Sequence, residues 1–272
     1  MIKRNLRKII FYMRAFRRLE LMNRAASLSY YTMISIFPTL VVTLMLSSLF
    51  VDPHALQTEV QIFLERALPF ESDLIIQNLN SLFKSKLSLS SWSVLMLFIS
   101  AQMLYVNMER IINSILHTER KRHFIIQRLF FFVWLIAMIS VLFAPVLVTL
   151  AASILQLMHI PVDGWAQVSG HVGFFLSSVF MFLVILLILP TRKLDKIRLG
   201  KGAVGFALTI QLGKMLFKLI MQRNLSRYNL VYGSLSSTML VMIWIFYFYN
   251  VFLFFVYWTG REHDPFFNKK GV

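Results

Sequence analysis

The sequence contains no cysteine, and charged residues make up only 15% of its 272 residues. The absence of cysteine excludes a disulfide framework, a cysteine-ligated metal site and a lipid-modified cysteine. So few charges, with 58% hydrophobic residues and 26 Phe, are outside the composition of a water-soluble domain of this length. Such a surplus of apolar and aromatic residues is typical of helices whose outer surfaces contact lipid. We therefore expect a membrane protein.

Several patterns that mark catalytic sites are also missing. There is no Gly-rich phosphate-binding loop, which argues against ATP-driven pumping by this chain alone, and no Gly-x-Ser-x-Gly turn that carries a serine nucleophile. Glu119 and His123 share a helical face, a spacing more typical of a surface contact than of a metal site. We expect neither enzymatic activity nor a metal or other cofactor. The six histidines lack the clustered spacing of metal ligands: His54, His117, His123, His159, His171 and His263.

Six stretches are apolar and long enough to cross a bilayer, because roughly 20 residues at about 1.5 Å each span about 30 Å of hydrocarbon. The expected fold class is therefore an all-α polytopic membrane protein with about six transmembrane helices. The second stretch is diluted by serines, and the fifth is interrupted by Gln211, Lys214 and Lys218. The six predicted spans are residues 30–51, 87–106, 129–155, 172–189, 203–221 and 234–258.

Basic residues are distributed unevenly between the predicted loops. The net charge of +16 would suggest nucleic-acid binding in a soluble protein, but in a membrane protein Lys and Arg accumulate in short cytoplasmic segments. With the N-terminus inside, the cytoplasmic segments hold 21 Lys and Arg and the external segments hold five. We therefore predict six spans in a bacterial inner membrane, with both termini cytoplasmic and no nucleic-acid partner.

Two segments outside the spans have helical patterns of their own. Within residues 1–28, apolar residues recur at helical spacing between Lys and Arg, which indicates either an amphipathic helix on the anionic inner leaflet or a simple positive anchor. We expect no cleavable signal peptide before it. Residues 52–86 contain two helix-start patterns and are predicted to form a small external helical cap. Without repeats or long linkers, residues 1–272 are predicted to form a single membrane domain.

Polar residues on the fifth predicted span are the candidates for a substrate path. Gln211, Lys214, Lys218 and Gln222 share one helix face, while Gly205, Thr209 and Gly213 are spaced by four and allow close approach of a neighbouring helix. A Lys near the bilayer centre is costly, so it normally faces protein or water. We expect Lys218 to snorkel to the outer interface and Lys214 to face a polar cavity.

Helix breakers and aromatic residues provide further candidates. Pro38 in the first span and Pro145 in the third can each kink a helix, either to line a binding site or as a packing defect tolerated by neighbouring helices. The aromatic-rich last span, from Trp244 to Trp258, is expected to face lipid.

Two motifs resemble a known family. The first, Ala25–Pro38, carries Tyr30, Tyr31, Ser35 and Pro38. The second, followed by Trp244, carries Tyr228, Tyr232, Gly233 and Ser234. Together they are similar to the entries into the first and last spans of the YihY/virulence factor BrkB family of bacterial inner-membrane proteins, and length, span count and charge layout agree with that resemblance.

The resemblance implies an integral inner-membrane protein with a role in serum resistance, envelope maintenance or transport of lipid-like or small solutes. A ribonuclease activity has also been attached to the family, but this chain lacks a cluster of metal-ligating residues. Many relatives end the last span with Gly-x-Glu, where this sequence has Phe255, Val256 and Tyr257. This chain therefore has no acid at that place to perform the role that the acid has in those relatives.

Two functions follow from these features. The first is transport of an anionic or amphiphilic solute, such as a lipid, along a polar path lined partly by the fifth helix. The second is a non-transporting envelope protein that organises lipids or binds partner proteins. A continuous polar cavity would favour the first function, and a filled helical core would favour the second.

Overall fold

The computed structural model describes residues 11–48, 91–118, 123, 125–134, 165–192, 194–232 and 236–263. These residues form helices and connecting turns, and this part of the chain contains no strand, which confirms the all-α fold class. The predicted external cap, 52–86, and most of the third predicted span lie outside the described residues. The helices are residues 11–18, α2 (Leu21–Ser48), α5 (Ser91–Ile115), Ile125–Trp134, α7 (Trp165–Ile188), α8 (Lys196–Tyr232), α9 (Ser236–Gly260) and the 3₁₀ turn η2 (Arg261–His263).

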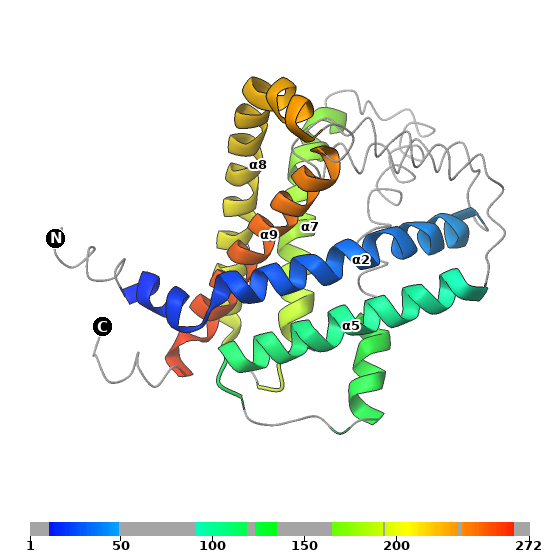
Figure 1. Ribbon diagram of the computed structural model, residues 1–272. Helices are drawn as coiled ribbons and strands as arrows, with labels where there is room; N and C mark the ends of the chain where they lie inside the picture. Colours follow the sequence, from blue (N-terminus) through cyan, green and yellow to red (C-terminus); the bar gives the residue numbers. More distant parts are fainter. Residues whose placement is uncertain are drawn as a thin grey trace, which may run out of the picture.

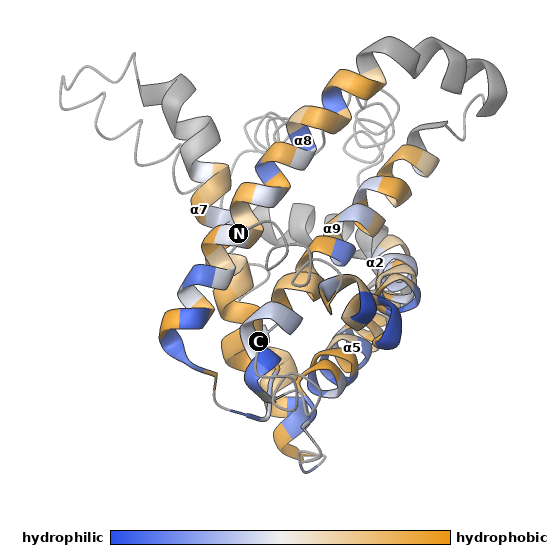
Figure 2. Ribbon diagram, turned by 90° about the vertical axis from the view of Figure 1, so that its left-hand side faces the viewer, coloured by the Kyte–Doolittle hydropathy of each residue, from blue (hydrophilic) through white to orange (hydrophobic). Residues whose placement is uncertain are grey.

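Within the described residues, two helical segments are apolar and long enough to cross a membrane: Lys196–Met221 in α8 and Thr238–Gly260 in α9. Two shorter apolar helices accompany them, Ile125–Trp134 and Gly173–Ile188. Figure 2 shows hydrophobic residues along most of α7, α8 and α9, with hydrophilic residues interrupting the pattern on α8.

Two helices extend well beyond the predicted spans. The first predicted span begins at Tyr30, but α2 begins at Leu21. The fifth was predicted as residues 203–221, whereas α8 has 37 residues and is about 55 Å long at about 1.5 Å per residue. Lys196 and Lys201, expected in a loop, lie in the first turns of α8. Basic residues ended the predicted apolar span, but they do not end the helix, because Lys and Arg favour helical conformation.

The helices form two pairs joined by α9 (Figure 1). Helix α2 packs against α5 on one side, and α7 packs against α8 on the other. Helix α9 contacts both α2 and α8, with a smaller contact to α5. The contact between Arg24 near the start of α2 and Ile111 near the end of α5 shows that these two helices run antiparallel.

Helix α9 lies at the centre of this arrangement, and none of its ten aromatic residues is exposed: four are buried and six are half-buried. Phe252 and Leu253 are fully buried, and Tyr249 and Tyr257 are nearly so. The prediction that the span from Trp244 to Trp258 faces lipid is therefore wrong. A helix that is apolar all round satisfies a lipid environment and a protein core equally well, so its composition did not separate the two.

Aromatic rings from three helices fill the space between α7, α8 and α9. Phe182 of α7 stacks on Phe206 of α8 with ring centroids 5.1 Å apart, and it meets Phe252 of α9 edge to face at 5.6 Å. Phe248 of α9 also contacts Phe206, at 5.5 Å. All of these rings except the half-buried Phe248 have no exposed surface. This part of the bundle is a packed core.

The segments predicted to be cytoplasmic meet at one end of the bundle. The guanidinium of Arg24 donates to the carbonyl of Ile111 over 3.5 Å, which joins the N-terminal segment to the end of α5. The Oδ1 atom of Asn113 accepts from the backbone N–H of Thr191 over 3.0 Å, which joins α5 to the α7–α8 connection.

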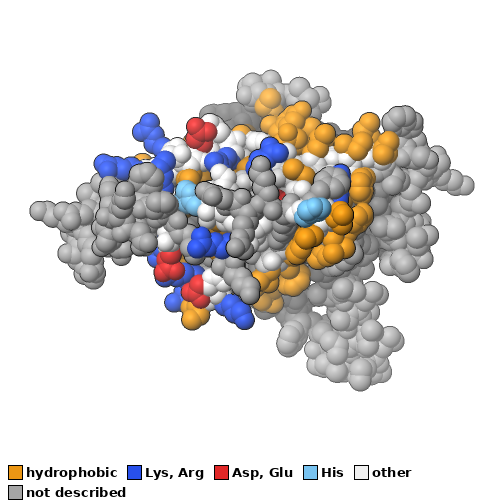
Figure 3. Space-filling view, turned by 90° about the horizontal axis from the view of Figure 1, so that it is seen from below, with side chains coloured by type: hydrophobic (Ala, Val, Ile, Leu, Met, Phe, Trp, Pro, Cys, Tyr) orange, Lys and Arg blue, Asp and Glu red, His pale blue; other side chains and the backbone are white. Residues whose placement is uncertain are grey.

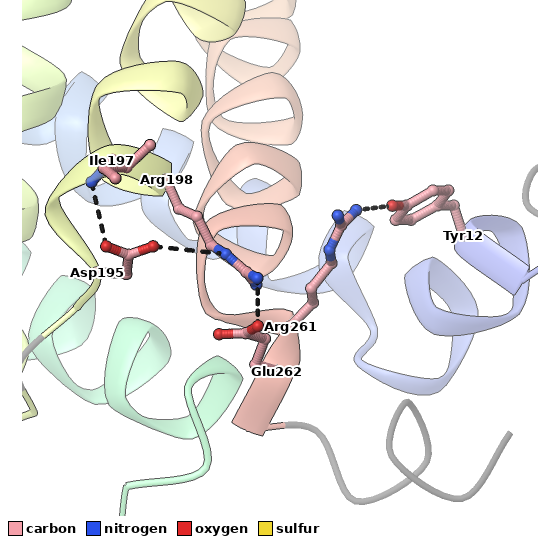
Figure 4. A network of polar contacts seen from close by, with 6 residues as sticks. All are labelled: Tyr12, Asp195, Ile197, Arg198, Arg261 and Glu262. Carbon is pink, nitrogen blue, oxygen red and sulfur yellow. Dashed lines mark hydrogen bonds and ion pairs between the residues drawn. The ribbon is translucent and has the colours of Figure 1, made fainter. Parts of the chain in front are cut away.

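A second set of contacts completes this end (Figure 4). Arg198 in the first turn of α8 pairs with Asp195, with N and O atoms 3.6 Å apart, and with Glu262 just after α9. Arg261 donates to the hydroxyl of Tyr12 in the 11–18 helix. In Figure 3, basic side chains concentrate on the left of the view, and hydrophobic ones dominate the right. These contacts join described residues of the four segments that the charge pattern assigns to one side, 1–29, 110–128, 192–201 and 259–272.

Candidate functional site on helix α8

The four polar residues predicted to line a path all lie on α8, and Lys214 is its central residue. Gln211 and Lys214 are half-buried, and Lys218 is exposed. The side chain of Gln222 lies outside the described residues. The snorkelling of Lys218 to the outer interface stays a prediction.

The ammonium of Lys214 is held against α7. Its Nζ atom lies 4.7 Å from the ring centroid of Phe174, a distance typical of a cation–π interaction. Phe174 is itself half-buried against the core. Lys214 therefore turns toward a neighbouring helix. Its role in lining a polar cavity or a substrate path stays a prediction.

The adjacent face of α8 is apolar and exposed. Its side chains recur every three or four residues, so they form one continuous stripe along the helix. In a membrane this stripe contacts acyl chains, and the polar residues run along its border. The stripe comprises Val204, Leu208, Leu212, Met215, Leu216, Leu219 and Ile220, which are 44% to 69% exposed.

The small residues of α8 face α9, as their spacing predicted. A Cβ atom added to Gly205 would lie 2.5 Å from the ring of Phe255, and one added to Gly213 would collide with the ring of Tyr247. The hydroxyl of Tyr247 also donates to the backbone carbonyl of Thr209 over 3.0 Å. Close approach of α8 and α9 therefore depends on these glycines.

The first motif lies on α2 and contributes to its contact with α9. Thr32 and Tyr249 share a hydrogen bond between their hydroxyls at 2.6 Å. Ser35 is buried and donates to the carbonyl of Thr32 over 2.9 Å, whereas Tyr30 is 55% exposed. Tyr31 is half-buried against the core. One face of this motif is thus a helix-packing surface.

Helix α2 continues through Pro38 to Ser48, so this proline does not end the helix. A kink at Pro38 stays a prediction, and Pro145 lies outside the described residues.

The second motif is described only in part. Tyr228 and Tyr232 lie in the last turns of α8, while Gly233 and Ser234 lie outside the described residues. Trp244 is only 6% exposed and stacks on Tyr247 with centroids 5.5 Å apart. It is a core residue of the α8–α9 contact.

A polar network at the end of α5 was not predicted from the sequence. Glu109 is 5% exposed and accepts a hydrogen bond from Gln127 over 2.7 Å. Asn113, one turn later, donates to the Glu109 carbonyl over 3.0 Å and accepts from the Thr191 hydroxyl over 3.1 Å. An acid on an apolar helix followed four residues later by Asn was a visible signal, but the partners are too distant in sequence to be identified from spacing.

Apolar outer surfaces, an aromatic core and basic residues gathered at one end define the class as a polytopic helical membrane protein. The model of the family described as "Virulence factor BrkB" matches residues 12–264. The chain belongs to this family, and the resemblance drawn from the two motifs is confirmed.

Three curated relatives are similar over most of their length. A UPF0761 membrane protein of Aggregatibacter aphrophilus is 26% identical over 239 residues, covering 87% of this chain and 84% of that protein. One from Haemophilus influenzae is 23% identical, covering 87% of each chain. One from Coxiella burnetii is 23% identical over 259 residues, covering 92% and 91%. These similarities identify a bacterial membrane protein. No solved structure matches the chain.

Proposed function

We propose that the protein moves an anionic amphiphile, such as a lipid, across a bacterial inner membrane along the polar border of α8. The observation that carries this proposal is the placement of Lys214. It is half-buried at the middle of a 37-residue helix, beside a continuous exposed apolar stripe. Lys214 also lies within Lys196–Met221, the part of α8 that can cross a membrane. A cation inside a membrane span attracts a phosphate or carboxylate, and the stripe accommodates acyl chains.

The packed core favours a path at the protein–lipid boundary over one through the centre. Phe182, Phe206 and Phe252 leave no exposed ring surface between α7, α8 and α9. An amphiphile at the edge of α8 keeps its acyl chains in lipid while its headgroup passes Lys218, Lys214 and Gln211. This route needs no wide aqueous channel among the described helices.

The orientation in this proposal has both termini in the cytoplasm and residues 52–86 outside, because Lys and Arg accumulate in cytoplasmic segments. Cysteines introduced at Arg17 and Ser72 test it cleanly, since the natural chain has none. A membrane-impermeant thiol reagent added from outside should label only the Ser72 site. Labelling of only the Arg17 site would show that the protein has the opposite orientation.

Reconstitution into liposomes tests the movement of lipid. Fluorescent phosphatidylglycerol should cross faster than in protein-free vesicles, and faster than fluorescent phosphatidylcholine. Lys214→Met should slow this movement about tenfold, because a charge-assisted contact contributes about 1.5 kcal/mol or more. Lys218→Met is the matched control and should change the rate less than threefold by the same scale. Rates equal to those of protein-free vesicles would reject transport.

The rival function is supported by the same packed core, because a filled bundle with basic contact surfaces also suits a protein that organises lipids or binds partners. It predicts that the protein moves no lipid in liposomes. It also predicts that Lys214→Met leaves an envelope phenotype intact.

A further inference from the structure

The 11–18 helix separates its side chains into two faces. Ala15 is 3% exposed, and Leu19 just after the helix is 6% exposed. On the opposite face Met13 is 64% exposed, and Arg14, Arg17 and Arg18 are exposed beside it. A helix with this division has one face in the protein core and one face available to a partner.

The inner face is docked on the end of α9. The ring of Tyr12 meets Phe254 edge to face with centroids 5.8 Å apart, and its hydroxyl accepts a hydrogen bond from Arg261. The guanidinium of Arg261 in turn lies 5.0 Å from the ring centroid of Trp258. These contacts, drawn in part in Figure 4, fix which way the outer face points.

A turn at Glu20 separates this helix from α2. Glu20 has a φ of 49°, a left-handed conformation that is uncommon for a residue with a side chain. Its carbonyl accepts from the N–H of Arg24 over 3.1 Å, which begins the hydrogen bonding of α2. The chain therefore changes direction here, and the 11–18 helix adopts a direction of its own at the basic end of the bundle.

The charge and chemistry of the outer face identify its partner. Arg14 and Arg17 carry two exposed guanidinium groups, a group that binds phosphate oxygens in bidentate fashion. No acidic residue occurs between positions 11 and 19, and the nearest acid along the chain is Glu20. Met13 adds an apolar side chain among the charges, a combination suited to the boundary between lipid headgroups and acyl chains.

We propose that this outer face binds the phosphate headgroups of anionic lipids in the leaflet that meets the basic end of the bundle. The Tyr12–Arg261 contact orients the face toward that leaflet. Binding here is separate from lipid movement along α8, so either proposal can fail alone.

The test uses the full-length protein in vesicles, with a cysteine in place of Met13 that carries a fluorophore. Vesicles of phosphatidylcholine are compared with vesicles containing increasing phosphatidylglycerol, each with a quencher attached to the headgroup region. Quenching should increase with the anionic lipid and should weaken at 1 M salt, where exposed charges are screened beyond about 3 Å.

The double variant Arg14→Gln with Arg17→Gln should lower the apparent affinity for phosphatidylglycerol, taken from the quenching curve, about 25-fold. Each basic residue near the surface contributes about fivefold to that affinity. The matched control is Lys196→Gln with Lys201→Gln, which removes two exposed charges from α8 at the same end and should leave the quenching curve unchanged. Equal quenching in neutral and anionic vesicles would overturn the proposal, and so would an unchanged curve in the arginine variant.

A second variant tests the docking. Tyr12→Phe keeps the ring against Phe254 but removes the hydroxyl that Arg261 contacts. The fluorophore at position 13 should then rotate more freely, measured as lower anisotropy, while quenching still depends on phosphatidylglycerol. Unchanged anisotropy would show that the Arg261 contact does not orient this face.

Discussion

Helices α8 and α9 are both apolar and long enough to cross a membrane, yet they occupy different environments. Helix α9 packs against α2, α5 and α8, and Leu253 in its C-terminal half has no exposed surface. Helix α8 turns Leu212 outward with 69% of its surface exposed. Composition places both helices in the membrane, but the number of packed neighbours decides which one forms the core and which one carries a surface site.

The largest expected effect is the difference in stability that one Leu→Ala substitution causes in α9 and in α8. Leu253→Ala should destabilise the bundle by about 2 kcal/mol or more, because the cavity it leaves costs about 24 cal/mol per Å³. Leu212→Ala should change stability by less than about 0.5 kcal/mol, since it alters an exposed face. Unfolding of the purified protein in mixed micelles measures both. Equal losses would contradict the assignment of α9 to the core.

The next largest effect is a difference in stability between Gly→Ala substitutions at two positions of α8. Gly213→Ala should cost about 1 to 2 kcal/mol, because the new Cβ collides with the ring of Tyr247. Gly200→Ala has no atom within 4 Å of its new Cβ and should stabilise the helix by up to about 1 kcal/mol through helix propensity. Thermal melting in detergent distinguishes the two signs, and a harmless Gly213→Ala would disprove the close α8–α9 contact.

A smaller effect is expected where α9 meets α2. Tyr249→Phe removes one partner of the 2.6 Å hydrogen bond with Thr32 and should cost about 1 kcal/mol. A double-mutant cycle with Thr32→Val should give a coupling of about 0.6 kcal/mol, the average for hydrogen bonds between membrane helices. Strictly additive losses would show that the two hydroxyls do not interact.

The smallest effect is expected at the rim of the bundle. The side chains of Arg198 and Glu262 are 30% and 48% exposed, so water screens their ion pair. Glu262→Gln should reduce stability by less than about 1 kcal/mol, and the difference from wild type should shrink as salt is raised. A larger loss that is insensitive to salt would indicate a structural role for Glu262 beyond this pair.

Much of this architecture was predictable from the sequence because the signals are local. Apolar length predicts helices in lipid, and the spacing of Gly205 and Gly213 predicts a close helix contact that the structure confirms. The basic segments were predicted to share one side, and the contacts of Arg24 with Ile111, Arg198 with Glu262 and Arg261 with Tyr12 join these segments at one end of the bundle.

The remaining features depend on which helices pack against each other, and the spacing of residues within one helix does not predict its neighbours. From the sequence, Trp244 was expected to face lipid. In the structure, Tyr247 and Phe217 pack against it. Thr191 is 78 residues from Asn113, so no periodic pattern connects them. The candidate site was predictable as a stripe on α8, but the position of Lys214 over Phe174 required the packing of α7.

Accessibility to lipid at Leu212 and Leu253 tests the central comparison most directly. Each leucine is replaced by cysteine in the otherwise cysteine-free chain, labelled with the same small fluorophore during unfolding and refolding, and exposed to lipids quenched along their acyl chains. The account predicts strong quenching at position 212 on α8 and little at position 253 on α9. Strong quenching at position 253 with little at position 212 would show that α9, not α8, carries the lipid-facing surface.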